Sequence, residues 1–232
     1  MPSIIEAAQS QVGRKILTGI TGLLLLFFVM FHLSGNLTIF GDSEAMNRYS
    51  MILHSFGPLL WIARAGLLIV FVLHAWIGIS IWLKRRKARP SHYNVYSSKG
   101  EPSRQGMSSR SMAFTGLILF IFVIFHLNTF ALGDMGNVEI DGQVTHDIRS
   151  LVLETFQNPV YAFGYTFVMI LLGTHLGHGV WSAFTSLGVK SRKASVLIYT
   201  IGAILAVLLA VGFLFIPLYI YFTGGAGPLI SG

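Results

Sequence analysis

The chain has 232 residues, of which 53% are hydrophobic and only 11% are charged. Because about a quarter of the residues in a soluble globular domain are charged, this composition excludes an ordinary soluble enzyme or binding domain. The net charge of +7 arises from 16 Lys and Arg against nine Asp and Glu, and the chain contains no Cys.

Five apolar runs are each long enough for a helix of about 20 residues that crosses a bilayer. They cover residues 15–37, 58–83, 111–132, 159–186 and 196–222. None of them alternates apolar and polar residues over the length of a strand, so helices are expected to satisfy the backbone hydrogen bonds. The first run is too long for the apolar region of a signal peptide. The sequence therefore predicts one all-α domain over residues 1–232, an integral membrane bundle of five transmembrane helices.

Positive charge gathers on one side of these spans. Thirteen of the 16 Lys and Arg lie at the start of the first span, in the loop 84–110 or in the segment 190–193. Seven of the nine acidic residues lie in the two opposite loops. The positive-inside rule then places the N-terminus in the cytoplasm and the C-terminus outside. The positive charge is therefore interpreted as a signal of membrane topology, and a nucleic-acid-binding surface is not expected. The loop 84–110 is either a solvated connector at the lipid headgroups or a dock for a soluble cytoplasmic partner.

Four histidines each lie inside a different span, at His32, His74, His126 and His175, and the fifth span contains none. An imidazole in hydrocarbon needs a partner, and a single one commonly bonds a neighbouring helix. Measured from the cytoplasmic ends of their spans at 1.5 Å per residue, His32 and His126 lie roughly 27 and 24 Å deep. His74 and His175 lie only about 15 and 17 Å deep. These depths predict an outer pair and an inner pair, which suits two metal centres.

The residue types around the four rings narrow the kind of metal centre. Zinc and non-haem iron sites normally include carboxylates or cysteines, and neither lies near these histidines. Two imidazoles without a further protein ligand are what a six-coordinate haem needs, and the lack of Cys excludes covalent c-type attachment. Small residues flank the rings and suit either clearance for a macrocycle or close helix contact. These are Ser34, Gly35, Ala75, Gly78, Gly173, Gly177 and Gly179.

The order of the four motifs "HLSGN", "HAWIG", "FHLN" and "THLGHGVWS" resembles the di-haem cytochrome b membrane anchor (b558 type) of succinate:quinone oxidoreductases. The resemblance covers nearly the whole chain, and the fourth motif is its most specific part. Cytochrome b of the bc type differs, because two histidines about 14 residues apart on one helix bind its two haems. The resemblance implies five helices that enclose two b haems.

The resemblance assigns the axial ligands of the haem irons residue by residue. It implies that His74 and His175 bind the proximal haem, near the cytoplasm, and that His32 and His126 bind the distal haem. It implies a hydrogen bond from His178 to a propionate or quinone, with a simple interhelical contact as the alternative. The fumarate-reductase branch can carry a glutamate for proton transfer where this chain has Gly173, so such a proton path is not expected.

The resemblance also implies a complex in the bacterial cytoplasmic (inner) membrane. A flavoprotein subunit would oxidise succinate, an iron–sulfur subunit on the cytoplasmic side would carry electrons, and this anchor would pass them to a membrane quinone, with menaquinone expected. Lipid surrounds the anchor, and succinate chemistry is not expected in this chain. Two alternatives remain: a haem b anchor of a formate dehydrogenase or hydrogenase, and a transporter whose histidines relay protons or bind a metal.

The quinone site has candidates on both sides of the membrane. Those near the distal ligands are Asn36, His54, Arg64, Asn128 and Asp134, and those near the proximal ligands are Arg14, Trp82, Arg110 and Trp181. The two tryptophans also suit an aromatic belt at the membrane interface. Arg64 lies inside a span without an intramembrane carboxylate, so it needs an anion such as a distal haem propionate, unless its side chain snorkels to the outer surface.

Overall fold

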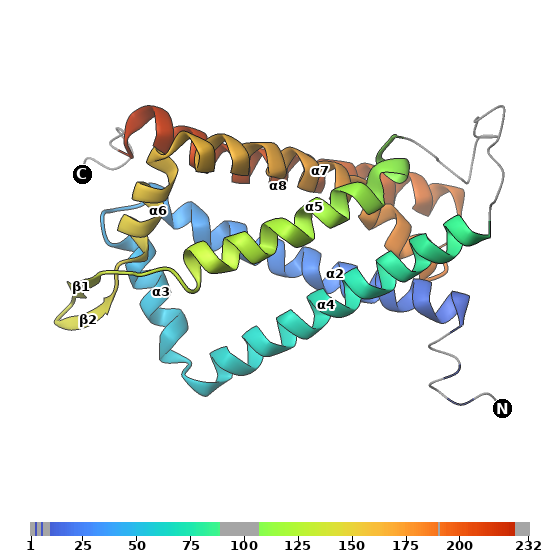
Figure 1. Cartoon of the computed structure of the whole chain (residues 1–232), viewed down its shortest axis with the longest axis horizontal. Helices are drawn as coiled ribbons and strands as arrows, with labels where there is room; N and C mark the ends of the chain where they lie inside the picture. The colour runs from blue at the N-terminus through green and yellow to red at the C-terminus, as the bar shows by residue number, and fades with distance from the viewer. Residues whose placement is uncertain (1–2, 4–5, 7–9, 89–106, 190, 226–232) are drawn as a thin grey trace. The chain divides into compact units, whose positions relative to one another are not determined.

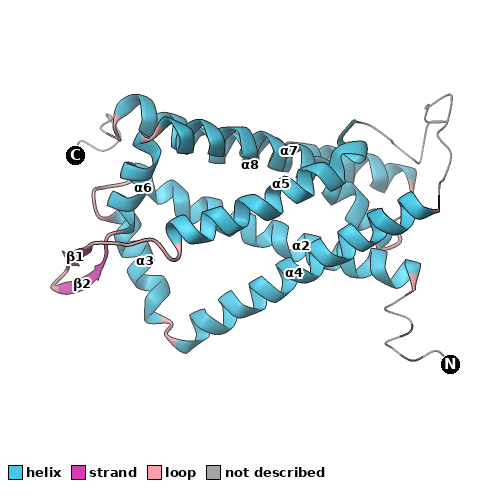
Figure 2. Ribbon diagram, in the orientation of Figure 1, coloured by secondary structure: helices cyan, strands magenta, loops and turns pink. Residues whose placement is uncertain are grey.

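The computed structural model describes residues 3, 6, 10–88, 107–189 and 191–225. Figure 1 labels its helices and strands, and Figure 2 shows that helices dominate the described residues. Five of these helices are long and apolar enough to cross a membrane. They are α2 (Gln11–Asn36), α4 (Pro58–Lys87), α5 (Met107–Phe130), α7 (Pro159–Ser186) and α8 (Arg192–Thr223). The prediction of a helical, multi-pass chain is confirmed at this level.

The helices extend beyond most of the predicted apolar runs, because a helix ends where its backbone groups find other partners rather than where hydropathy falls. Side-chain oxygens cap three N-termini: Ser10 accepts from Gly13 N (3.0 Å), Ser191 from Ala194 N (3.2 Å) and Asn158 from Val160 N (2.9 Å). At the other end, α4 continues through four basic residues to Lys87, where cations favour the negative end of the helix dipole. The bounds of α7 agree with the predicted span 159–186.

The loops between the spans contain structure that the sequence analysis did not predict. These elements are a 3₁₀ turn η1 (Leu37–Phe40), α3 (Ala45–Ser55), α6 (Ile148–Gln157) and a hairpin of β1 (Asn137–Ile140) with β2 (Gln143–His146). The strands are antiparallel, with Asn137 opposite His146. Asp141 and Gly142 both have positive φ, 52° and 76°, as a two-residue type I′ turn requires.

The described chain divides into two compact units, and each of the five long helices contributes residues to both. Unit 1 consists of residues 1–27, 67–117 and 173–207, and unit 2 consists of residues 28–66, 118–172 and 208–232.

In unit 1 the helices approach through small residues. A Cβ on Gly19 of α2 would lie 3.3 Å from the carbonyl oxygen of Ala183 on α7. A Cβ on Gly202 of α8 would lie 2.9 Å from a methyl group of Val180 on α7. Such close contacts are the usual source of helix association in a membrane, where the hydrophobic effect between helices is weak.

In unit 2 a buried apolar cluster joins η1, α3, α6 and α8. Its buried members are Ile39, Met46, Val152, Phe156, Ile216 and Ile220. A polar link joins α3 to α6, since buried Asn47 donates to Asp147 Oδ1 (2.8 Å) and accepts from Arg149 N (2.9 Å). Unit 2 therefore has a folded cap built from the segments that connect its membrane-length helices.

Candidate functional site

The structure brings His74 of α4 and His175 of α7 together within unit 1. Their ring centroids lie 6.4 Å apart, and the ring planes are inclined by 72°. Both side chains are half-buried. We call these residues the His74–His175 pair.

Each ring of the His74–His175 pair rests against a Thr-Gly dipeptide of another helix. On α2, Thr21 Oγ1 lies 3.2 Å from Nδ1 of His74, and a Cβ on Gly22 would lie 3.1 Å from its Cε1. On α5, Thr115 Oγ1 lies 3.1 Å from Nδ1 of His175, and a Cβ on Gly116 would lie 3.4 Å from its Cε1. The two imidazoles therefore have matching surroundings: a hydroxyl at Nδ1 and a glycine beside Cε1.

His32 of α2 and His126 of α5 form a second pair within unit 2, the His32–His126 pair. Their ring centroids lie 5.6 Å apart, with ring planes inclined by 85°. Aromatic rings surround this pair: Phe28 stacks on His32 at 5.3 Å and Phe122 stacks on His126 at 5.6 Å. Nδ1 of His126 is buried and has no hydrogen-bond partner among the described residues.

The ligand chemistry of the two pairs fits a haem iron. In each pair the two imidazoles lie close enough for both to bind one metal ion, with ring centroids 6.4 and 5.6 Å apart. No group of three or more His, Cys, Asp or Glu that could hold a metal ion occurs among the described residues. Each pair thus suits a metal that brings its remaining ligands with it, as haem iron does.

His178 lies one helical turn beyond His175 on α7 and is half-buried. Its ring centroid lies 6.0 Å from that of Trp181 on the same helix. The close ring partner of His74 in unit 1 is His175, not His178.

The candidates expected near the distal ligands are partly brought together by the structure. Arg64 Nη2 lies 3.5 Å from Nε2 of His54, and its guanidinium lies 5.1 Å from the ring centre of Trp61. Asn36 donates to the backbone carbonyl of His32 (2.7 Å), a bond within α2. Asn128 and Asp134 are exposed.

Among the candidates of unit 1, Trp82 and Trp181 have different described neighbours. The guanidinium of Arg86 lies 5.0 Å from the ring centre of Trp82, which is a contact between neighbours on α4. Trp181 contacts His178, as described above. The side chain of Arg110 and most of the basic loop, residues 89–106, lie outside the described part of the chain.

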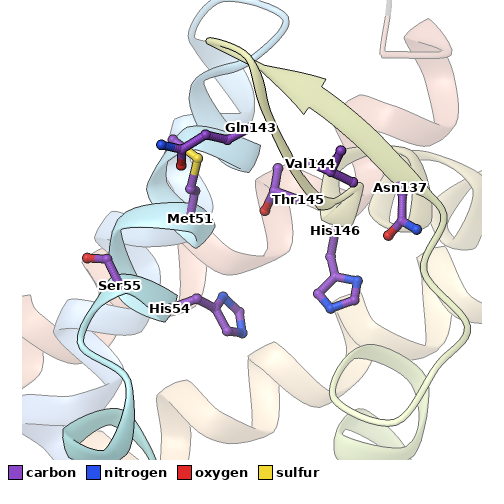
Figure 3. A pocket seen from close by; sticks show the side chains of 8 residues that line it. All are labelled: Met51, His54, Ser55, Asn137, Gln143, Val144, Thr145 and His146. Carbon is purple, nitrogen blue, oxygen red and sulfur yellow. The ribbon is translucent and has the colours of Figure 1, made fainter.

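His146, which no sequence pattern singled out, lines a pocket in unit 2. His146 of β2 and His54 of α3 face each other across it, with ring centroids 6.2 Å apart (Figure 3). The pocket has a volume of about 360 Å³, within the common range for small-molecule sites of about 300–1,000 Å³. We call it the α3–β2 pocket, and its lining is Met51, His54, Ser55, Asn137, Gln143, Val144, Thr145 and His146. The Asp-Gly turn signal before β2 was the available sign that His146 belongs to a folded hairpin.

Comparisons with models of protein families, with curated proteins and with solved structures returned no match for this chain.

Proposed function

We propose that the chain is the haem-b-binding membrane anchor of a succinate:quinone oxidoreductase, working as succinate dehydrogenase or fumarate reductase. The observation that carries the proposal is that four histidines from four helices form two separate ring pairs. Each pair could supply two imidazoles, which would hold the iron of one haem. The order of the four motifs, which resembles the di-haem anchor family, supports the choice of enzyme.

In this proposal the His74–His175 pair holds the proximal haem and the His32–His126 pair holds the distal haem. A bound haem supplies one-electron chemistry, and the chain's own residues hold the ligand rings and keep water from them. Phe28 and Phe122 cover the rings of His32 and His126 by stacking on them. Thr21 and Thr115 hold the rings of His74 and His175 by contact with Nδ1. Residues beyond the first ligands commonly set ligand orientation and metal affinity in this way.

The proposed partners are a flavoprotein subunit and an iron–sulfur subunit on the cytoplasmic side of the bacterial inner membrane. The basic end of α4, Lys84–Lys87, supports this orientation through the positive-inside rule, with the N-terminus in the cytoplasm and the C-terminus outside. Because the chain has no Cys, any Cys-ligated iron–sulfur cluster must come from a partner.

For the quinone, with menaquinone expected, we propose the α3–β2 pocket of unit 2. His54 and His146 line it, and Arg64 lies beside His54. Nδ1–H of His54 donates to the carbonyl of Ser50 (2.8 Å), so its Nε2 accepts from Arg64. His54 thus orients the guanidinium of Arg64. The imidazole of His146 and the guanidinium of Arg64 supply N–H donors of the kind that a quinone carbonyl oxygen accepts from.

The test is to purify the chain in detergent with its native partners and measure haem by the pyridine haemochrome method. We expect two non-covalent b haems per chain, a co-purifying flavoprotein and iron–sulfur subunit, and reduction of the haems by succinate. A colourless, well-folded protein would favour a transporter. Haems that formate or hydrogen reduces, while succinate does not, would point to an anchor of another quinone-linked enzyme.

A further inference from the structure

The two helices that carry the outer histidines contain a repeated segment. Residues 21–33 read TGLLLLFFVMFHL and residues 115–127 read TGLILFIFVIFHL, so nine of thirteen positions are identical. Each copy begins with a Thr-Gly dipeptide and ends with a histidine and a leucine. The repeat thus places a threonine and a histidine at the same spacing on α2 and on α5.

One end of each copy supplies a proposed haem ligand, and the other end contacts a ligand of the other pair. The histidines of the two copies, His32 and His126, form one pair within unit 2. The threonines, Thr21 and Thr115, each contact one member of the other pair within unit 1, at 3.2 and 3.1 Å from Nδ1. Each threonine therefore has an equivalent position and an equivalent partner.

The hydroxyl hydrogen of each threonine is already used within its own helix. Thr21 donates to the carbonyl of Leu17 at 2.7 Å, and Thr115 donates to the carbonyl of Ser111 at 3.1 Å. Both threonines are buried, with 8% and 2% of their surface exposed. A hydroxyl has one hydrogen to donate, so each oxygen can bond an imidazole nitrogen only by accepting. The proton of each neutral imidazole must then lie on Nδ1, which leaves the lone pair on Nε2.

We infer that Thr21 and Thr115 are positioning residues that select the Nδ1–H form of His74 and His175 and so present Nε2 to the proximal iron. This inference rests on the proposed haem-binding function. A hydrogen bond at the far nitrogen fixes the tautomer and the ring orientation and makes the ligand more basic. A more basic axial ligand favours ferric over ferrous iron, so each threonine lowers the midpoint potential of the proximal haem.

The His32–His126 pair offers an internal comparison. Its member His126 has a buried Nδ1 without a hydrogen-bond partner among the described residues, in place of a threonine hydroxyl. Loss of a threonine hydroxyl should therefore change the midpoint potential of the proximal haem alone. The distal haem serves as a reference in the same sample.

The test uses Thr21→Val and Thr115→Val, which keep the shape of threonine and remove the hydroxyl, and Thr21→Ser and Thr115→Ser, which retain it. The control is Thr200→Val, because the exposed Thr200 of α8 makes the same bond to its own helix, with Val196 O at 3.0 Å. Each purified complex is titrated by spectroelectrochemistry, and its haem content is measured.

We expect both valine variants to raise the midpoint potential of one haem, the same haem in each, while both serine variants and Thr200→Val match the wild type. Loss of that haem alone in a valine variant, restored in the serine variant, supports the inference as well. Unchanged potentials, or loss of both haems in the valine and serine variants alike, would overturn the inference and leave the haem-binding proposal intact. A wild-type protein without haem would overturn both.

Discussion

Gly22 of α2 leaves little room beside His74 of α4, since a Cβ on Gly22 would lie 3.1 Å from Cε1 of the imidazole. A Cβ on Gly116 would lie 3.4 Å from Cε1 of His175, an ordinary van der Waals separation. The two rings thus have similar neighbours, but the ring of His74 has less room to tolerate an added methyl group.

We therefore expect Gly22→Ala to displace the ring of His74 and to weaken binding of the proximal haem by roughly tenfold or more, the scale of changes beside a metal ligand. Gly116→Ala should have a smaller effect. Gly66→Ala is the control, because a Cβ there meets nothing within 4 Å. Haem content after dilution in detergent measures the effect. Equal haem loss from all three variants would contradict this reading of the contact.

The His32–His126 pair supports a second prediction. His32→Ala and His126→Ala should each remove the distal haem and leave the spectrum of the proximal haem intact, because each leaves one imidazole for one iron. The low-temperature absorption spectrum of the reduced protein separates the two haems and measures the result. Loss of the proximal haem in either variant would show that the pairs are assigned to the wrong centres.

Hydropathy predicted the helical class and the five long helices, because a membrane-length apolar run has few other stable structures. It did not predict where α2 and α8 begin, because Ser10 and Ser191 cap these helices through local hydrogen bonds. It also missed α3, α6 and the hairpin, because these elements are stabilised mainly by contacts with one another and by the Asn47–Asp147 link.

The sequence likewise indicated only some residues of the candidate site. One histidine in each of four consecutive apolar spans drew attention to these four residues. His146 is exposed and lies on a short strand outside the spans, where a histidine is not unusual. Thr21 and Thr115 escaped notice because threonine in a membrane helix commonly bonds its own backbone. Their second contact, to an imidazole on another helix, depends on how the helices pack.

The motif on α7 gives a third prediction. His175→Ala should remove the proximal haem, and His74→Ala should do the same, because each leaves a single axial bond to iron. His178→Ala should keep both haems, since in unit 1 its close ring contact is with Trp181 and His74 pairs with His175. Haem content and the reduced spectrum of the three variants measure this. Loss of the proximal haem in His178→Ala, with retention in His175→Ala, would place the ligand one helical turn further along.

Asp147 supports a prediction about pH. Burial alone would raise the pKa of its carboxyl, but hydrogen bonds from Ser150 and Asn47 outweigh burial and hold that pKa below its usual value. A depressed pKa contributes stability that is fully present above the unfolded pKa, about 3.9, and is lost as the pH falls through the folded value. We expect the thermal stability of the wild type to fall more steeply below about pH 4 than that of Asp147→Asn. Thermal unfolding followed by circular dichroism measures the difference, and parallel curves would contradict it.

The last prediction concerns His54 and His146, which line the α3–β2 pocket from two separate elements. His146→Gln changes the position of an N–H donor that lines the pocket. His54→Gln removes the imidazole nitrogen that accepts from Arg64 and so changes the position of that guanidinium. If quinone binds there, each variant should raise the KM for quinone and slow succinate-dependent quinone reduction while both haems remain bound and reducible by succinate.

Two controls separate this pocket from a general disturbance of unit 2. Val144→Thr changes another residue that lines the pocket and is exposed. The two side chains have similar size, and the valine that is lost had no hydrogen-bond donor. Arg64→Gln removes the cation beside His54 Nε2. We expect wild-type kinetics from Val144→Thr and a raised KM from Arg64→Gln, because a quinone then loses the guanidinium N–H donors beside His54. Normal quinone kinetics in His54→Gln and His146→Gln, with both haems reduced by succinate, would exclude this pocket and move the search to the residues beside the His74–His175 pair.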